Sequence, residues 1–183
     1  MELTIEKRDA SRKRECKRLL REGRIPCVIY GKAGKSTPMS ISTAEFGAAL
    51  RGIKGGCLPT TRFSLKGEGD AVVKDIQYHR TTYDVIHLDF ELIEEGQEIE
   101  VSVPIHCVGA DQAPGIKTAG GVLRQVIRML PVRALPGKIP SEVVIDVSGL
   151  EMKQTRRLRD IALPDGVKPR RKLDDVVVVI AKR

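Results

Sequence analysis

The sequence is poor in aromatic residues and has no long apolar run. Its 183 residues include three Tyr, three Phe and no Trp, so Val, Ile and Leu must build any core. No run approaches the roughly 20 apolar residues of a membrane-spanning helix, and the N-terminus MELTIEKRD has no signal-peptide core. We therefore expect a soluble, cytoplasmic protein with one large or two small packed domains.

The cysteines have no metal-binding spacing. Cys16, Cys27, Cys57 and Cys107 form no C-x-x-C pair, and the three histidines stand apart from them. A zinc site needs clustered ligands, so reduced structural or surface thiols are the better interpretation. We expect no metal and no cofactor.

The charge is strongly positive, with a net value of +8 and a pI near 9.5. Between Lys7 and Arg24 the chain holds nine Lys or Arg against three acidic residues. Such a cluster repels itself and binds a polyanion through counterion release. Nucleic acid is the first candidate and a membrane surface the second; a solvated, partly flexible arm is the alternative.

Alternation of apolar and polar residues predicts a mainly β fold with a few short helices. Ser42 to Glu45 has the spacing of a capping box, and the helix it opens places Phe46, Ala49, Leu50 and Ile53 on one side until Gly55-Gly56 ends it. Residues 12–22 form either a short helix with Leu19 and Leu20 turned inward or a basic loop. Strands are expected near residues 3–5, 28–30, 39–41, 61–65, 71–79, 85–90, 99–107, 122–134, 143–147 and 176–181.

A change of composition predicts two domains, 1–92 and 93–183. Residues 91–115 contain six acidic residues and no Lys or Arg. Pro104 within this stretch indicates an edge or bulge position. The later basic segment, 153–172, has Leu158, Ile161 and Leu163 as anchors, and a solvated charge run is preferred there to a second RNA or protein contact.

The stretch 71–90 is predicted to be a hairpin with one apolar and one polar face. Asp75, Gln77 and His79 share a face of the first strand, opposite Ile76 and Tyr78. His87 and Asp89 share a face of the second, opposite Ile86, Leu88 and Phe90. The polar groups are of the kinds that pair with base edges and ribose hydroxyls.

Two other interpretations of this polar face compete with contacts to nucleic acid. An acid–base enzyme using His87 and Asp89 would also need a nucleophile or metal, and no G-x-S-x-G, H-E-x-x-H or phosphate-loop motif occurs. An ordinary solvent-facing strand usually carries Lys, Glu and Thr rather than two His and a Gln. We therefore predict that the polar face recognises nucleic acid and that the protein has no enzyme activity.

Several motifs resemble those of a known family. The run RLLREGRIPCVIYG at residues 18–31 resembles the RRLRREGKVPAVVYG signature of bacterial large-subunit ribosomal protein number twenty-five, whose two-domain members are also called general stress protein CTC. D-I-Q-Y-H at 75–79 and H-L-D-F at 87–90 are similar to that family's D-x-Q-x-H and H-x-D-F elements. Similar motifs of the CTC-type C-terminal domain occur at 120–123, 133–136, 139–140, 146–150 and 163–167.

The resemblance implies a six-stranded-type N-terminal β-barrel that binds 5S rRNA and a mostly β C-terminal domain. It implies a structural constituent of the large ribosomal subunit, monomeric when free, with neighbouring ribosomal proteins as further partners. A stress-related RNA-binding translation factor acting off the ribosome is the alternative. Residue by residue, it implies phosphate contacts from Arg8, Lys13, Lys17, Arg18 and Arg21, a backbone contact from Tyr30, and base or ribose contacts from Gln77, His79, His87 and Asp89.

The basic stretch departs from the family pattern. Residues 12–18 read RKRECKR, where the family often has GKGASRR. Cys16 stands where a Ser could bond phosphate, and Lys17 replaces a bidentate Arg by a point charge. The frequent acidic C-terminal tail is absent from this sequence.

Overall fold

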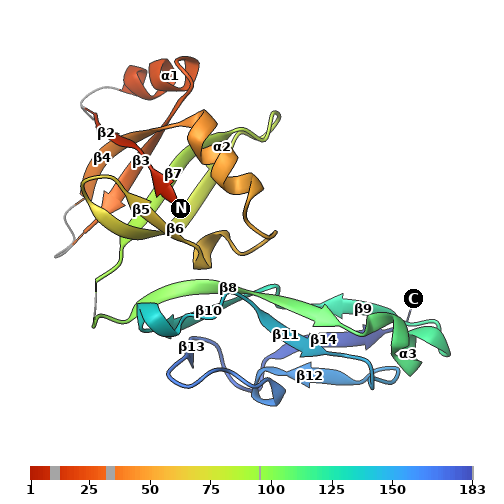
Figure 1. The fold of residues 1–183 in the computed structure, drawn as a ribbon. Coiled ribbons are helices and arrows are strands. Elements are labelled where there is room, and N and C mark those ends of the chain that lie inside the picture. The colour runs from red at the N-terminus through yellow and green to blue at the C-terminus, as the bar shows by residue number, and fades with distance from the viewer. Residues whose placement is uncertain (9–12, 32–35, 95, 183) are drawn as a thin grey trace. The chain divides into compact units, whose positions relative to one another are not determined.

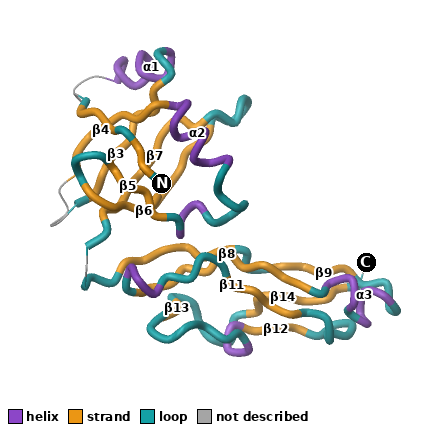
Figure 2. The backbone as a smooth tube through the Cα atoms, viewed as in Figure 1, coloured by secondary structure: helices purple, strands orange, loops and turns teal. Residues whose placement is uncertain are grey.

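The computed structural model describes residues 1–8, 13–31, 36–94 and 96–182, and these residues form two compact units. The units are Met1–Gln97 and Glu98–Arg183, whereas the composition placed the change near residue 92. Both units are mainly β, as predicted (Figure 1, Figure 2). Among the described residues, no helix has both the length and the apolar character needed to cross a membrane.

The first unit is a nearly closed, barrel-like sheet. Its strand order is β1-β5-β6-β7-β3-β4-β2, so the two edges are the consecutive strands β1 and β2, joined by Thr4. One bent N-terminal strand therefore pairs with β5 on one side and β4 on the other, which leaves six strands in the ring. Its strands are β1 (Glu2–Leu3), β2 (Ile5–Lys7), β3 (Arg24–Tyr30), β4 (Ser36–Ser42), β5 (Arg62–Leu65), β6 (Gly69–Tyr78) and β7 (Val85–Leu92).

Two α-helices accompany this sheet. Helix α1 (Lys13–Arg21) resolves the choice between helix and loop; Leu19 is buried as predicted, but Leu20 is exposed. Helix α2 (Thr43–Arg51) buries Phe46 in the core, and a short 3₁₀ turn, η2 (Leu58–Thr60), follows it. Figure 1 shows α1 outside the sheet, near the start of β3.

The predicted capping box of α2 is wrong. Ser42 makes no side-chain capping bond, and the Glu45 carboxylate accepts a hydrogen bond from the Thr4 N–H at 3.0 Å instead. Glu45 thus connects α2 to Thr4, the residue at which the sheet closes. This long-range contact replaces the predicted local bond between Glu45 and the start of its own helix. The helix also ends earlier than predicted, at Arg51 with Gly52 as its C-cap.

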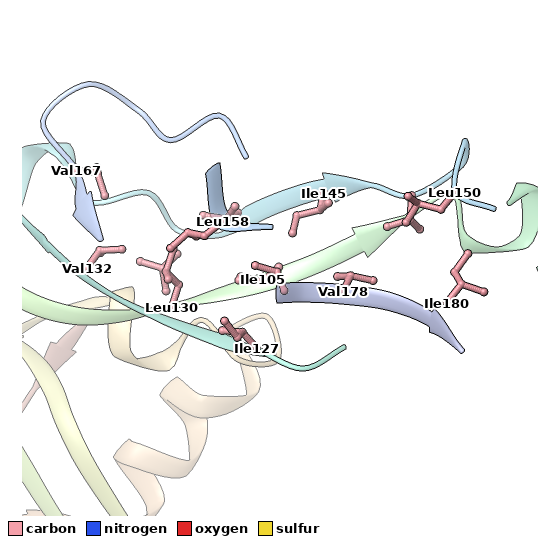
Figure 3. Close-up of a cluster of buried hydrophobic side chains, with 14 of the residues drawn as sticks. Ile105, Ile127, Leu130, Val132, Ile145, Leu150, Leu158, Val167, Val178 and Ile180 are labelled. Carbon is pink, nitrogen blue, oxygen red and sulfur yellow. The ribbon is translucent and has the colours of Figure 1, made fainter. Parts of the chain in front are cut away.

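The second unit packs a four-stranded sheet, β11-β8-β10-β13, and a three-stranded sheet, β12-β14-β9, around one core. Figure 3 shows Ile105, Ile145 and Val178 pointing into this core from three different strands. The strands are β8 (Ile99–Val108), β9 (Val122–Gln125), β10 (Met129–Ala134), β11 (Val143–Asp146), β12 (Thr155–Arg157), β13 (Lys168–Pro169) and β14 (Val176–Ala181). Short helical turns are η3 (Ala110–Gln112), α3 (Pro114–Lys117), η4 (Pro136–Lys138) and η5 (Leu158–Asp160).

Two details of this unit refine the predictions. Residues 122–134 are strand, as expected, but they split into β9 and β10, which belong to different sheets. Pro104 lies where β8 pairs with β10 on one side, whereas the β11 pairing on the other side begins only at Ile105. The missing N–H of Pro104 therefore costs no bond of the β11 ladder.

Candidate nucleic-acid interface

The hairpin β6–β7 brings its polar residues together by register. Asp75 lies opposite Asp89, and Gln77 lies opposite His87. Since Leu88 packs into the core between the two pairs, all four polar side chains share the outer face of the sheet. These four residues, here called the polar hairpin face, assemble as the period of two predicted.

His87 and Asp89 form a close pair on this face. The distance from His87 Nδ1 to Asp89 Oδ1 is 3.1 Å, and about a quarter of each side chain is exposed. Asp89 Oδ1 itself is buried and accepts no well-aligned hydrogen bond from the described residues. The carboxylate therefore keeps acceptor capacity beside a ring that can donate or accept.

His79 lies beyond the paired part of the hairpin, in its turn. The Thr82 N–H donates to His79 Nδ1 at 3.3 Å, so Nε2 carries the proton of the neutral ring and is a donor. The backbone N–H of His79 donates to the Asp84 carbonyl at 2.7 Å. His79 is exposed and also lines a groove of about 540 Å³ together with Leu20, Phe46 and other residues, a groove that neither Gln77 nor His87 lines.

Tyr78 departs from the predicted apolar face. The register shifts between Gln77 and Tyr78, and the Tyr78 side chain is 47 % exposed. A β-bulge re-aims the residues beside it, which sequence alternation alone does not reveal.

Helix α1 presents its cations away from the sheet. At 100° per residue, Lys17 and Arg21 point opposite to the buried Leu19, and Arg14 and Arg18 follow them on one side of the helix. All four are exposed and are here called the basic arc; Arg18 Nε lies 3.5 Å from Glu22 Oε1. The side chain of Lys13, the fifth predicted phosphate contact on this stretch, lies outside the described residues.

The Arg8 guanidinium contacts two other residues of the first unit. Its Nε donates to the Met39 carbonyl at 3.0 Å, and its Nη1 approaches Cys16 Sγ at 3.7 Å. The guanidinium thereby links β2 and β4 to α1. A contact with phosphate would use its remaining donors.

Arg24 is not among the predicted RNA-binding residues, but it too lies on the outer surface of the first unit's sheet. Its Nη2 lies 2.9 Å from Glu6 Oε2, and its Nε donates to Ser40 Oγ at 3.3 Å. Alternation along β3 predicts this position, because Cys27 points inward and Arg24, three residues earlier, lies on the opposite face. Tyr30, at the end of β3, is 40 % exposed and lies opposite Glu91 of β7.

The basic and polar parts approach one another across β3. Burial raises the pKa of the Cys27 thiol to about 12, Arg8 and Arg24 lower it, and Asp89 raises it further. Three charged groups thus lie within electrostatic range of a single buried residue. Val28, next to Cys27, is the strand partner of Asp89, which gives the same proximity from the register.

The acidic stretch of the second unit is largely neutralised within that unit. Glu98 contacts Lys168 at 2.8 Å and Arg133 at 3.2 Å, while Glu100 contacts Arg170 at 3.2 Å. The hydrogen bond and charge of Lys168 lower the pKa of Glu98. Within either unit taken by itself, the described residues bring no three metal-ligating side chains together.

Comparisons with known proteins cover the whole chain. The model of the Ribosomal L25p family matches residues 3–90, and that of the Ribosomal protein TL5, C-terminal domain, matches residues 98–183. The chain is 39 % identical over 186 residues to the large ribosomal subunit protein bL25 of Chlamydia trachomatis serovar L2 (strain ATCC VR-902B / DSM 19102 / 434/Bu) and 40 % identical over 186 residues to that of Chlamydia muridarum. It is 40 % identical over 187 residues to the bL25 of Chlamydia pneumoniae; each comparison spans 100 % of both chains.

Proposed function

The chain belongs to the bL25 family of large-subunit ribosomal proteins, and from that premise we propose that it binds 5S rRNA through α1 and the polar hairpin face. The family consists of structural constituents of the ribosome rather than enzymes. The predicted family membership and the predicted lack of enzyme activity are both confirmed at the level of the family.

The proposed interface consists of two surfaces, the basic arc and the polar hairpin face, which have different roles. The basic arc neutralises phosphates, which supplies affinity and orientation without reading sequence. The polar hairpin face supplies selectivity, since Gln offers donor and acceptor together and a carboxylate accepts from base amino groups. Arg8, Tyr30 and His79 extend the contact at its edges.

The observation that carries the proposal is the register of β6 with β7. It places Gln77 against His87 and Asp75 against Asp89 on an outer face, where no core packing explains them. A shift of one residue would turn these groups toward the core. The polar set is therefore a property of the folded hairpin and is available to a ligand.

Outside the ribosome the protein is proposed to be a cytoplasmic monomer. On the subunit, the second unit is proposed to contact neighbouring proteins, because the acidic residues Glu98 and Glu100 are unfavourable beside RNA and already pair with Arg133, Lys168 and Arg170 of the same unit.

The test is binding of the full chain to 5S rRNA and to an unrelated hairpin RNA of equal length, each over a salt series. Tight binding to 5S rRNA alone, with a slope that reports several phosphate contacts, is the expected result. Equal binding to both RNAs would reduce the interface to a generic basic surface. Release from large subunits by a high-salt wash would favour a factor acting off the ribosome.

A further inference from the structure

The second unit has an edge strand that contains no Lys, no Pro and no bulge. Native edges are blunted by Lys, Pro or bulges. The edge strand β13 consists of Lys168 and Pro169, and the edge strand β12 has a register shift at Arg156/Arg157. The edge strand β11 begins with three β-branched residues, reads VVID, and pairs among the described residues with β8 alone.

The direction of the free backbone groups follows from one hydrogen bond. The Val147 N–H donates to the Val108 carbonyl at 3.0 Å, so the odd-numbered residues of this segment face β8. Neighbouring residues of a strand direct their N–H and C=O groups to opposite sides. Val144 and Asp146 therefore direct theirs toward the open edge, and the Val144 side chain is 54 % exposed.

A cleft of about 270 Å³ runs along this edge. One wall consists of Val144, Ile145 and Asp146, and the other of Arg156 with residues 160–162. All of its lining residues belong to the second unit. Edge donors and acceptors that face a cleft match the requirements of an added strand.

The charges of the cleft select among extended ligands. The carboxylates of Asp146 and Asp160 line it against one guanidinium, that of Arg156. Hydrogen bonds from the backbone and side chain of Ser148, and to a smaller extent the charge of Arg156, lower the pKa of Asp146, which keeps it ionised at neutral pH. Arg159 Nε lies 3.8 Å from Asp160 Oδ1, so the excess of negative charge among the lining residues is centred on Asp146. Such an excess repels phosphate and attracts Lys or Arg.

We propose that β11 is a docking edge for an extended segment of a neighbouring ribosomal protein, which adds as a strand and places Lys or Arg beside Asp146 and Asp160. The alternating backbone groups of β11 call for a polypeptide rather than RNA. This inference rests on membership of the large-subunit family and not on binding to 5S rRNA, so the two fail separately.

The experiment is hydrogen exchange by mass spectrometry on the full chain, free and rebound to large subunits that lack it. Exchange of the segment 143–147 is expected to slow by about tenfold or more on the subunit. Unchanged exchange there, with the chain bound, would overturn the proposal. Protection of the free chain that rises with its concentration would identify a second copy as the occupant, and crosslinking of the cleft to RNA would also overturn it.

Two pairs of variants sharpen the test. Val144→Pro removes an outward N–H and leaves the β8 ladder intact, whereas Val144→Ala keeps that N–H; only the proline should abolish the protection. Ala162→Lys and Ala162→Glu change the charge of an exposed wall residue, and the lysine should weaken retention after a salt wash more than the glutamate does. The reverse order would rule out a basic segment. Binding of free 5S rRNA, measured in parallel, should be the same for all four variants.

Discussion

Gln77 and His87 lie directly opposite one another on the outer face of the β6–β7 hairpin. Their neighbours along the two strands, Asp75 and Asp89, form the next pair. Two adjacent rows of one sheet thus carry an amide opposite an imidazole and a carboxylate opposite a carboxylate. It is the part of the proposed interface that can distinguish one RNA from another.

Replacing Gln77 or His87 by Ala should weaken binding to 5S rRNA by about 1–3 kcal/mol per lost contact. The dependence of binding on salt should hardly change, because neither side chain neutralises a phosphate. Isotherms over a salt series measure both quantities. Gln112→Ala, at an exposed position of the second unit, is the matched control; equal losses on an unrelated RNA would contradict a role in selectivity.

The double variant Lys17→Ala, Arg21→Ala should weaken binding to every RNA tested. Each neutralised phosphate contributes a slope of about −0.7 to −0.9 in the logarithm of affinity against the logarithm of salt concentration, so the slope should fall by nearly two such steps. The same isotherms provide the measurement. Lys66→Ala serves as control because Lys66 is an exposed cation of the same unit, near Glu2 at 3.9 Å; an unaltered slope in the double variant would exclude the basic arc.

Local patterns predicted the residues that face one another within a hairpin or along a helix. The period of two from Asp75 to Gln77 and from His87 to Phe90 depends on adjacent residues alone, as does the helical spacing of Phe46 with its neighbours, and both describe the structure. The outward cations of α1 follow equally from the position of Leu19.

Contacts between distant segments could not be predicted in this way. The Glu45 carboxylate meets Thr4, 41 positions away, and Arg8 meets Cys16 and Met39 through the way the sheet closes. The register shift beside Tyr78, where Ile86 of β7 is left without a partner on β6, depends on how the two strands pair and not on adjacent residues alone. Each of these features is set by tertiary geometry, which overrides the local signal.

Alkaline pH should destabilise the first unit through Cys27. The thiol ionises near its ordinary pKa of 9.0 in the unfolded chain but only near 12 in the folded one, chiefly because it is buried. Between these values the unfolded state binds fewer protons, so this group lowers the free energy of unfolding by about 1.4 kcal/mol per pH unit as pH rises. Below pH 9 the contribution is constant.

Denaturant unfolding at several values between about pH 9 and pH 11, in the intact protein and in Cys27→Ala, measures this contribution. The alanine variant should have a lower free energy of unfolding at neutral pH, because it leaves a cavity, but a shallower decline above pH 9. Cys16→Ala, in the half-buried α1 position, provides the control. Parallel profiles for the intact protein and Cys27→Ala would show that the thiol does not titrate as described.

Gly109→Ala should destabilise the second unit more than Gly120→Ala or Gly137→Ala. Gly109 has φ +77°, and an added Cβ would lie 2.9 Å from Ser148 Cβ and 3.0 Å from Asp146 Oδ1. Asp146 Oδ1 also accepts a hydrogen bond from the Ser148 N–H. Gly120 has φ +66° with no atom within 4 Å of such a Cβ, and Gly137 has neither constraint. Hydrogen exchange of β8 and β14 should rank the three losses as near zero for Gly137→Ala, about 1–2 kcal/mol for Gly120→Ala and more for Gly109→Ala. Equal losses at Gly109 and Gly120 would mean that backbone strain alone matters and that the Ser148 loop moves to admit a methyl group.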